Sequence, residues 1–520
     1  MLIDFVHVFD RKEFKSLIIG ITCFALGICS ACGLAPWHNL ILFSIGFGGF
    51  VRLIAQASSM FSAVTLGCVF GFGHFLFSFF WISNAFFVDE IRYGWLAPFA
   101  VIGISGFLSI FSGASAYFTW FISKKLKLLI FGQVLVFACF WILLEWVRSQ
   151  IFTGFPWNLV ASIWAESIEM MQFAAYVGVY GLGLITLILA CFPVVIIERG
   201  RNFNSLMLII AFILVVGAFW KLGSLRLAKS ENAILDNVAI RLVQANISQK
   251  LKWDPRYKRA NIDKQIELSF LSTQTNINPK YIVWPETAVP FNLSSNRKLR
   301  QYLTEFVKKN GLLITGGLRV DEEASSSPDY FNSLYVLGGG GEIHATYDKV
   351  HLVPFGEYVP FKNILRFSKL TDGRVDFSSG SGVRVFSLKN LPSFAPLICY
   401  EAIFSDEVRA LKPRPDWLLN ITNDAWFGSS AGPYQHLAAV RFRAIELGVP
   451  LVRSANTGIS ALIDPYGRVI KKINLGDTGV IDFFLPARIL SPPFYGRVGE
   501  LVTIVLFTFI FLISFVFRRK

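Results

Sequence analysis

The sequence is poor in charged residues, and this scarcity excludes an ordinary soluble protein. Only 16% of the 520 residues are charged, whereas 54% are hydrophobic and 52 are phenylalanine. Together with a positive mean hydropathy, this composition is typical of an integral membrane protein. Methionine is scarce as well, at five residues, so the chain offers no methionine-rich binding surface.

Acidic residues are outnumbered by basic ones, and the formal net charge is +14. Such a balance can indicate nucleic-acid binding, but the lysines and arginines are not gathered into one stripe interleaved with aromatic side chains. Many of them instead flank apolar segments, as membrane topology demands. We therefore expect a lipid bilayer as partner and no nucleic acid.

Eight apolar stretches are long enough to cross a bilayer, for which roughly 20 residues are needed. A polar segment of about 250 residues separates the last two, and it is too long to be a loop. The sequence thus predicts seven transmembrane helices over 1–222, a second domain over 223–498, and an eighth helix with a short tail over 499–520. The stretches cover approximately 16–35, 39–57, 60–82, 95–122, 128–147, 169–196, 205–222 and 499–517.

Basic residues around the spans predict the orientation of the chain. They fall at alternate ends of the spans, as Lys124, Lys125 and Lys127 do, whereas opposite connections such as "NAFFVDEIRYG" carry little positive charge. Because cytoplasmic loops carry the excess of Lys and Arg, both termini are expected in the cytoplasm and 223–498 on the other side. A cleaved signal peptide is the alternative for the first stretch, but its loss would invert the charge alternation of all later spans.

Apolar runs alternate with helical patterns in the second domain. Helices are expected at 257–275, 296–311 and 433–448, and a hairpin turns on the four glycines 338–341. This alternation predicts an α/β layered domain. Buried strands are expected in "VAIRLVQANI", "YIVWPE", "GLLITGGLRV", "FAPLICYE", "DWLLNITND" and "PLVRSANTG".

One cysteine, Cys399, lies in this domain, and the other six lie in or beside the hydrophobic stretches. Without a partner cysteine it cannot join a disulfide framework there or a cysteine-based zinc site. It is therefore either a small buried hydrophobe or a working thiol. The histidines His344, His351 and His436 stand at no metal-ligand spacing, so we expect no metal.

Three apolar runs of the domain end at a reactive group: Glu286, Lys349 and Cys399. Rigid scaffolds present chemistry at such strand ends. A free thiol is only partly ionised at neutral pH and needs a base, which a carboxylate provides, while a lysine ammonium stabilises the thiolate and the oxyanion of an attacked carbonyl. A histidine base, as in Cys–His enzymes, remains the alternative.

The elements "WPE", "KVHLVPFGEYVP", "ICYE" and "NDAWFG", with the flanking spans and "EWVRSQIFTGFPWN" (145–158), resemble the apolipoprotein N-acyltransferase family of bacterial inner membranes. The second domain is similar to the nitrilase (carbon–nitrogen hydrolase) superfamily. The resemblance covers nearly the whole chain and implies a periplasmic four-layer α-β-β-α sandwich beside eight membrane helices. It implies a cofactor-free triad of Glu286, Lys349 and Cys399. Supporting or substrate-binding roles are implied for Glu357, Glu401, Tyr400, Trp253, Asn423 and Trp426.

Two of these supporting carboxylates have a predicted position. Glu357 lies eight residues after Lys349 in the same loop, where it can orient the ammonium. Glu401 alternates with Cys399 along the expected strand, so it should share the face of the thiol. Both carboxylates would keep Lys349 protonated.

The resemblance implies a two-step acyl transfer by a protein that we expect to be a monomer. The thiol takes an acyl chain from a phospholipid as a thioester, and the α-amine of a diacylglyceryl apolipoprotein then receives it. An α-amine with a pKa near 7.7–8.0 is partly neutral at pH 7, so it can attack the activated thioester. The stretch 355–370 mixes apolar and basic residues as interfacial segments do, and we predict that it guides acyl chains.

Two other functions fit parts of the sequence. In a membrane-tethered amidase or nitrilase, water takes the acyl group, and the triad cannot separate the two reactions; the seven preceding spans exceed what an anchor needs. A transporter or receptor would show internal repeats or intramembrane charges, whereas these spans are almost free of charge. Glu145 and Arg148, at a span end, are interpreted either as an ion pair or as a contact to lipid headgroups.

Overall fold

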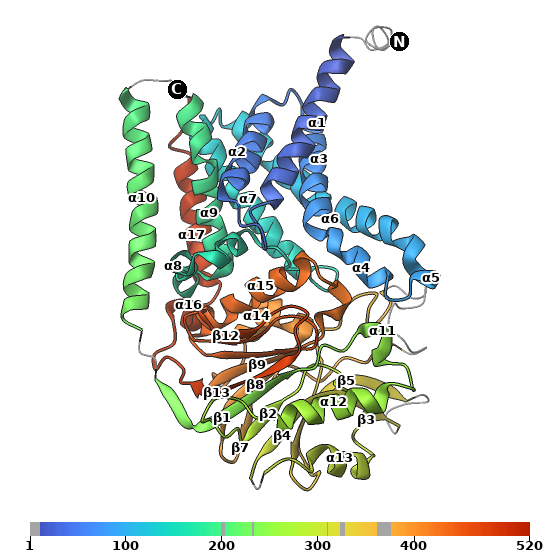
Figure 1. Ribbon diagram of the computed structural model, residues 1–520. Coiled ribbons are helices and arrows are strands. Elements are labelled where there is room, and N and C mark those ends of the chain that lie inside the picture. The colour runs from blue at the N-terminus through green and yellow to red at the C-terminus, as the bar shows by residue number, and fades with distance from the viewer. Residues whose placement is uncertain are drawn as a thin grey trace.

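A bundle of apolar helices stands on an α/β domain in the computed structural model (Figure 1). The predicted interfacial stretch 355–370 falls, from residue 361 on, outside the described residues. Of residues 11–14 only the backbone is described. The structure describes residues 11–198, 203–230, 233–308, 310–322, 328–360 and 376–519.

Five helical stretches are long and apolar enough to cross a membrane. The first joins α3 (Met60–Phe79) to α4 (Ser83–Phe86), and the second joins α5 (Glu90–Tyr93) to α6 (Ala97–Lys125). The other three are α7 (Ile130–Gln150), α9 (Ala174–Glu198) and α10 (Phe203–Ala228).

Five of the eight predicted spans are thus confirmed by length and composition. Two further apolar helices are shorter, α2 (Leu40–Gln56) and α17 (Leu501–Ser514), and a third, α1 (Arg11–Ala31), has described side chains only over Lys15–Ala31. That these three also cross the bilayer stays a prediction.

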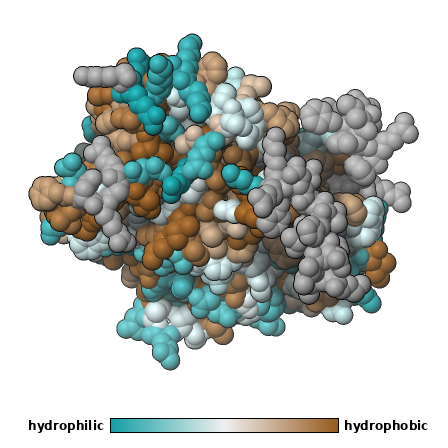
Figure 2. Space-filling model, turned by 90° about the horizontal axis from the view of Figure 1, so that it is seen from above, coloured by the Kyte–Doolittle hydropathy of each residue, from teal (hydrophilic) through white to brown (hydrophobic). Residues whose placement is uncertain are grey.

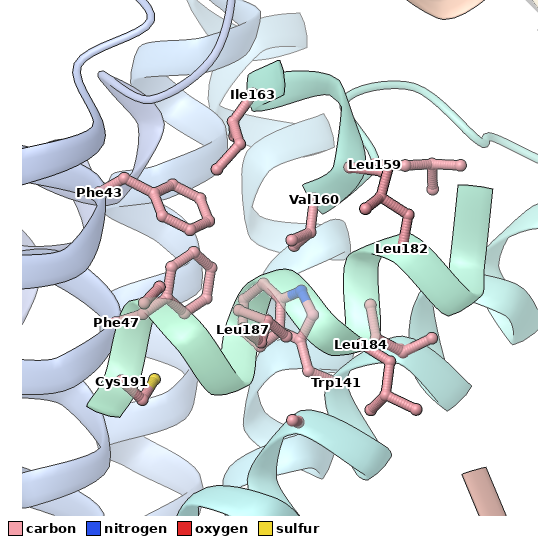
Figure 3. Packing of buried hydrophobic residues seen from close by; sticks show 14 of the residues in the cluster. Phe43, Phe47, Trp141, Leu159, Val160, Ile163, Leu182, Leu184, Leu187 and Cys191 are labelled. Carbon is pink, nitrogen blue, oxygen red and sulfur yellow. The ribbon is translucent and has the colours of Figure 1, made fainter. Parts of the chain in front are cut away.

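Close packing of aromatic and small side chains holds the bundle together. Phe43 and Phe47 of α2 lie opposite Trp141 of α7, with Cys191 of α9 beside them (Figure 3). Glycine lets neighbouring helices approach, since a Cβ added at Gly27 of α1 would fall 2.1 Å from a main-chain oxygen of α3. Such small-residue contacts are how membrane helices associate where burial of apolar surface no longer drives them together.

Glu145 and Arg148 of α7 form a buried ion pair, with 4.0 Å between Oε1 and Nη2. The Glu145 carboxylate also accepts hydrogen bonds from Trp141 Nε1 and the Val160 main-chain N–H. Of the two interpretations of this couple, the ion pair is the one that these contacts support.

Two sheets form the centre of the α/β domain. The inner strands β1, β2 and β4 of one sheet pair in parallel, as do β8, β9 and β10 of the other. The seven-stranded sheet runs β13 (Gly479–Pro486), β1 (Ile234–Gln244), β2 (Tyr281–Val283), β4 (Leu312–Asp321), β5 (Asp329–Gly338) and β6 (Ile343–Asp348), with β3 (Val289–Asn292) beside β4. The six-stranded sheet runs β12 (Val469–Ile473), β11 (Ser460–Ile463), β10 (Leu451–Ala455), β9 (Trp417–Thr422), β8 (Leu391–Ile398) and β7 (Phe386–Leu388).

Alternation of side chains along the strands produces four layers. Ile240 and Leu242 of β1 face Leu419 and Ile421 of β9 in a core between the sheets. Alternate residues face outward onto helices, as β-strand geometry requires. Helices α12 (Lys258–Phe270) and α13 (Arg297–Thr304) cover the first sheet, and α14 (Ser405–Arg409) and α15 (Ala431–Leu447) cover the second. This is the α-β-β-α sandwich that the resemblance implied.

Short elements complete the chain. They are α8 (Ile168–Met171), α11 (Gln249–Lys252), α16 (Phe494–Val498) and the 3₁₀ turns η1 (Phe80–Ile82), η2 (Gly94–Leu96), η3 (Val160–Glu166), η4 (Cys399–Ile403) and η5 (Asp424–Phe427).

The buried amide of Gln435, on α15, joins the sandwich to the bundle. Its Oε1 accepts hydrogen bonds from Trp81 Nε1 and Trp157 Nε1, both at 2.9 Å, and from Asn158 Nδ2 at 3.1 Å. Its Nε2 donates to the main-chain oxygens of Ala35 and Ser78. One side chain thus pairs groups from several segments of the bundle.

We predict that Gln435→Ala lowers the thermal unfolding midpoint of the detergent-solubilised protein by several degrees. The substitution leaves two indole N–H groups and one amide without an acceptor, at roughly 1–3 kcal/mol for each buried group left unpaired. Gln301→Ala, at an exposed position on α13, is the matched control and should leave the midpoint unchanged. Equal midpoints for the two variants would contradict the prediction.

Candidate active site

A buried lysine lies between two buried carboxylates at one end of the seven-stranded sheet. Lys349 follows β6, and its Nζ lies 2.8 Å from Glu357 Oε2 and 3.6 Å from Glu286 Oε1. Burial alone would lower the pKa of Lys349, but the carboxylates of Glu357 and Glu286 outweigh it and raise that pKa above its ordinary value. The side chain is therefore an ammonium, and the structure brings Glu357 into direct contact with it, as its position in the same loop predicted.

The amide of Asn332 bridges the two carboxylates. Its Nδ2 donates to Glu286 Oε1 at 2.7 Å and to Glu357 Oε1 at 2.9 Å, and its main-chain oxygen accepts from the Lys349 N–H. Sequence reasoning missed this residue. The signal was a lone asparagine inside the apolar strand "YFNSLYVL", because a buried polar group needs a partner.

Cys399 sits where β8 ends and the 3₁₀ turn η4 begins, with a backbone φ of +53°. A left-handed conformation is uncommon for a residue other than glycine, and it persists only where the surroundings enforce it. Here the Cys399 carbonyl accepts hydrogen bonds from Asn420 Nδ2 at 3.4 Å and His436 Nε2 at 3.3 Å. The turn ends strand β8 directly before Cys399.

This turn makes the predicted position of Glu401 wrong. The strand stops at Ile398, so the alternation that was to place Glu401 on the thiol's face ends before it. The carboxylate instead accepts N–H groups of Ile398 and Val350, both at 2.6 Å, and the Tyr347 hydroxyl at 2.9 Å. Glu401 therefore ties the cysteine turn to the chain that follows Lys349.

Charges of both predicted partners act on the thiol. Burial raises the pKa of Cys399, the Glu286 carboxylate raises it further, and the Lys349 ammonium lowers it. The resting group is therefore the protonated thiol rather than the thiolate. The thiol becomes a nucleophile only when a base takes its proton. This favours a mechanism in which Glu286 acts as that base over one in which a thiolate is already paired with Lys349.

The histidine alternative finds no support in the geometry. Asp424 Oδ1 lies 2.9 Å from Nδ1 of the buried His436, and Nε2 donates to the Cys399 main-chain oxygen, so both ring nitrogens are occupied. His351 Nδ1 lies 2.7 Å from Glu407, and His344 lies beside Glu342. Among the residues that the structure describes, no group of three or more His, Cys, Asp or Glu side chains could hold a metal ion.

The remaining predicted residues lie around this centre in different settings. The Tyr400 hydroxyl donates to the Gly154 carbonyl at 2.9 Å, in the loop after α7. Asn423 is buried and bonded to Gln249 and Asn456, which indicates a structural role for its amide. Trp253 is half-buried at the end of α11, and Trp426 is half-buried in η5.

We predict that Asn332→Ala slows acylation of Cys399 by at least about tenfold. A hydrogen bond to a charged group contributes roughly 1.5–3 kcal/mol, and both carboxylates lose one. The rate of adduct formation, followed by intact mass, is the measurement. Asn276→Ala, at an exposed position, serves as the control, and equal rates in the two variants would contradict the role given to Asn332.

Comparison with known proteins places the chain in a class. Residues 239–485 match the family model of the carbon-nitrogen hydrolases, and residues 26–192 match that of the apolipoprotein N-acyltransferase N-terminal domain. The chain also aligns with a solved CN-hydrolase superfamily protein from Xanthomonas campestris, at 20% identity over 48% of this chain and 90% of that chain, with a TM-score of 0.35. The two family models, together with the apolar helices and the carboxylate–lysine–cysteine centre, define a membrane protein with a nitrilase-like domain.

Curated relatives narrow the class to one family. The apolipoprotein N-acyltransferase of Rhodopseudomonas palustris is 38% identical, over 88% of this chain and 86% of that protein. Those of Bradyrhizobium diazoefficiens and Rickettsia typhi are 36% and 34% identical, over 95% of this chain and 93% and 97% of theirs. The chain belongs to the apolipoprotein N-acyltransferase family.

Proposed function

We propose that this enzyme N-acylates lipoproteins through a thioester on Cys399, with membrane phospholipid as the acyl donor. The acceptor is the N-terminal α-amine of a diacylglyceryl-cysteine. Family membership over most of the chain supports the reaction. The observation that carries the mechanism is the buried centre in which the charges of Glu286 and Lys349 both act on the thiol.

In the first step Glu286 takes the proton of Cys399, and the sulfur attacks the carbonyl carbon of a phospholipid ester. Negative charge develops on the carbonyl oxygen, and the Lys349 ammonium stabilises it. When the C–O bond breaks, the lysophospholipid leaves with the proton that Glu286 held. The acyl chain stays on the sulfur as a thioester.

In the second step the neutral α-amine of the apolipoprotein attacks the thioester carbonyl. The C–N bond forms, the C–S bond breaks, and the amine proton passes through Glu286 to the departing sulfur. The products are an amide and the free thiol. The centre returns to its starting protonation state, so the cycle needs no cofactor.

Contacts at the base of the bundle support delivery of lipid to the thiol. The hydroxyl of Tyr400, the residue after Cys399, donates a hydrogen bond to the Gly154 carbonyl, and the ring of His351 contacts the Thr153 carbonyl. Both carbonyls belong to the loop that leaves α7. The proposed nucleophile is therefore held against the loop that leaves the helical bundle.

We further propose eight spans in a bacterial inner membrane, with both termini cytoplasmic, the 223–498 domain periplasmic, and a monomeric enzyme. The start of α1 and the end of α17 lie at the end of the bundle away from the sandwich (Figure 1). The Leu129 N–H donates to the Phe517 oxygen there, which joins a basic connection to the basic tail. Hydrophilic residues lie among hydrophobic ones on this end (Figure 2).

The first test is intact-mass detection of an acyl adduct after exposure to labelled phospholipid. Wild-type protein should gain one acyl chain, which a lipoprotein N-terminal peptide then removes as its amide. Cys399→Ala should show no adduct, and Glu286→Gln should slow its formation at least about hundredfold, the lower range for loss of a general base. Steady release of free fatty acid without an acceptor would instead support a hydrolase.

A second test uses the pH dependence of Cys399 alkylation by iodoacetamide. Burial and Glu286 raise the pKa of this thiol, so its alkylation should reach half its limiting rate above the pH of about 8.5 that a free thiol shows. Glu286→Gln removes one negative charge and should move this midpoint to lower pH while acyl transfer is lost. A midpoint that stays in place or rises would contradict the proposed pair.

A further inference from the structure

A second lysine enters the centre from the short helix α11. Lys252 is buried, at 4% exposure, whereas the two residues before it, Lys250 and Leu251, are exposed. Its Nζ donates a hydrogen bond of 2.9 Å to the main-chain oxygen of Glu286. Burying an ammonium costs free energy unless an opposite charge compensates it, so the burial of the Lys252 side chain requires an explanation.

Compensation comes from the reacting groups themselves. In the described part of the chain, no carboxylate oxygen lies within the 4.0 Å of a salt bridge to Lys252. The charge that acts on it in the resting site is that of the Glu286 carboxylate, and Cys399 adds a negative charge only when its sulfur is a thiolate. Burial lowers the pKa of Lys252 to about 8, and the Glu286 carboxylate works against this shift, so the ammonium is still largely protonated at pH 7.

The charges of the centre need such a cation. Lys349 is one ammonium shared by two buried carboxylates, Glu286 and Glu357, which leaves an excess of negative charge. In a poorly hydrated site, two carboxylates with too little positive charge make one of them hold a proton. If that one were Glu286, it could not receive the proton of Cys399.

The main chain of Glu286 also needs a fixed position. The next residue, Thr287, has a φ of +45°, a left-handed conformation that a β-branched residue rarely adopts. The hydrogen bond from Lys252 therefore holds the carbonyl of a strained turn, and through it the base at the turn's start.

We propose that Lys252 is a positioning residue for acylation, which fixes the Glu286 main chain and supplies the second cation that keeps the Glu286 carboxylate ionised. This role rests on the proposed function, because it assumes that Glu286 is the base for Cys399. It adds a fourth charged group to the Glu286, Lys349 and Glu357 set, from a helix outside both sheets. The residue acts through Glu286 rather than on the acyl group.

The test measures the rate of acyl-adduct formation on Cys399 against pH. Lys252→Met should move the acidic limb of the profile up by about one pH unit, the lower range for loss of a neighbouring opposite charge, and so slow adduct formation by up to about tenfold at pH values on the acidic side of that limb. Raising the pH should recover most of the rate. Lys252→Arg should keep the limb in place, and Lys250→Met, the exposed control, should behave as wild type.

A rate loss that is the same at every pH would assign Lys252 a merely structural role and overturn the proposal, as would an unchanged rate. If Lys252→Met does not accumulate in membranes, Lys252→Gln against Lys252→Arg gives the same comparison. Absence of an adduct on the wild-type enzyme would defeat the proposed function itself. If the wild-type enzyme forms the adduct normally and the acidic limb of the pH profile does not move in Lys252→Met, only the role of Lys252 is contradicted.

Discussion

The ion pairs of Lys349 with two carboxylates, buried between strand ends, constrain the whole catalytic centre. Removing one member of such a buried set costs roughly 3–5 kcal/mol, because it leaves an uncompensated charge. The surrounding chain therefore has to supply every donor that these groups need. Asn332 bridges both carboxylates, and the main chain around Glu286 and Lys349 is fixed by hydrogen bonds from other strands. The arrangement is prepared before any lipid arrives, which is the condition for electrostatic stabilisation of a transition state.

The thiol is held by a second, separate network. Arg453, Asp424 and His436 are buried completely, Arg453 forms an ion pair with Asp424, and His436 and Asn420 donate hydrogen bonds to the Cys399 carbonyl. This rigid support explains how a non-glycine residue keeps a left-handed conformation. The network around Lys349 therefore determines the charge near the sulfur, and the network around Arg453, Asp424 and His436 determines the backbone conformation of Cys399.

The sequence allowed Glu286, Lys349 and Cys399 to be predicted because each ends an apolar run, and a single motif placed Glu357 beside Lys349. The position of Glu401 could not be predicted, because the left-handed turn at Cys399 depends on side chains from distant segments. Asn332 and Lys252 were missed for a related reason, because the groups that they bind, the carboxylates of Glu286 and Glu357 and the main-chain oxygen of Glu286, come from distant parts of the sequence. The alternation of strands and helices predicted a layered α/β domain, whereas the four-layer order came only from the family resemblance. Helices α2 and α17 are shorter than the apolar runs 39–57 and 499–517 that predicted them.

A tether would suffice to keep a hydrolase at a membrane, but the contacts here specify more than proximity. Gln435 accepts from two tryptophans and an asparagine of the bundle, and Tyr400 binds the loop after α7 from the position next to the nucleophile. These hydrogen bonds fix the height and orientation of the thiol relative to the helices. The acyl donor and acceptor of this enzyme family are both anchored in a bilayer, so they do not reach the thiol by free diffusion through water. Their effective concentration at the thiol depends on where the reacting atoms are held. The bundle is therefore part of the active site's construction rather than an anchor for it.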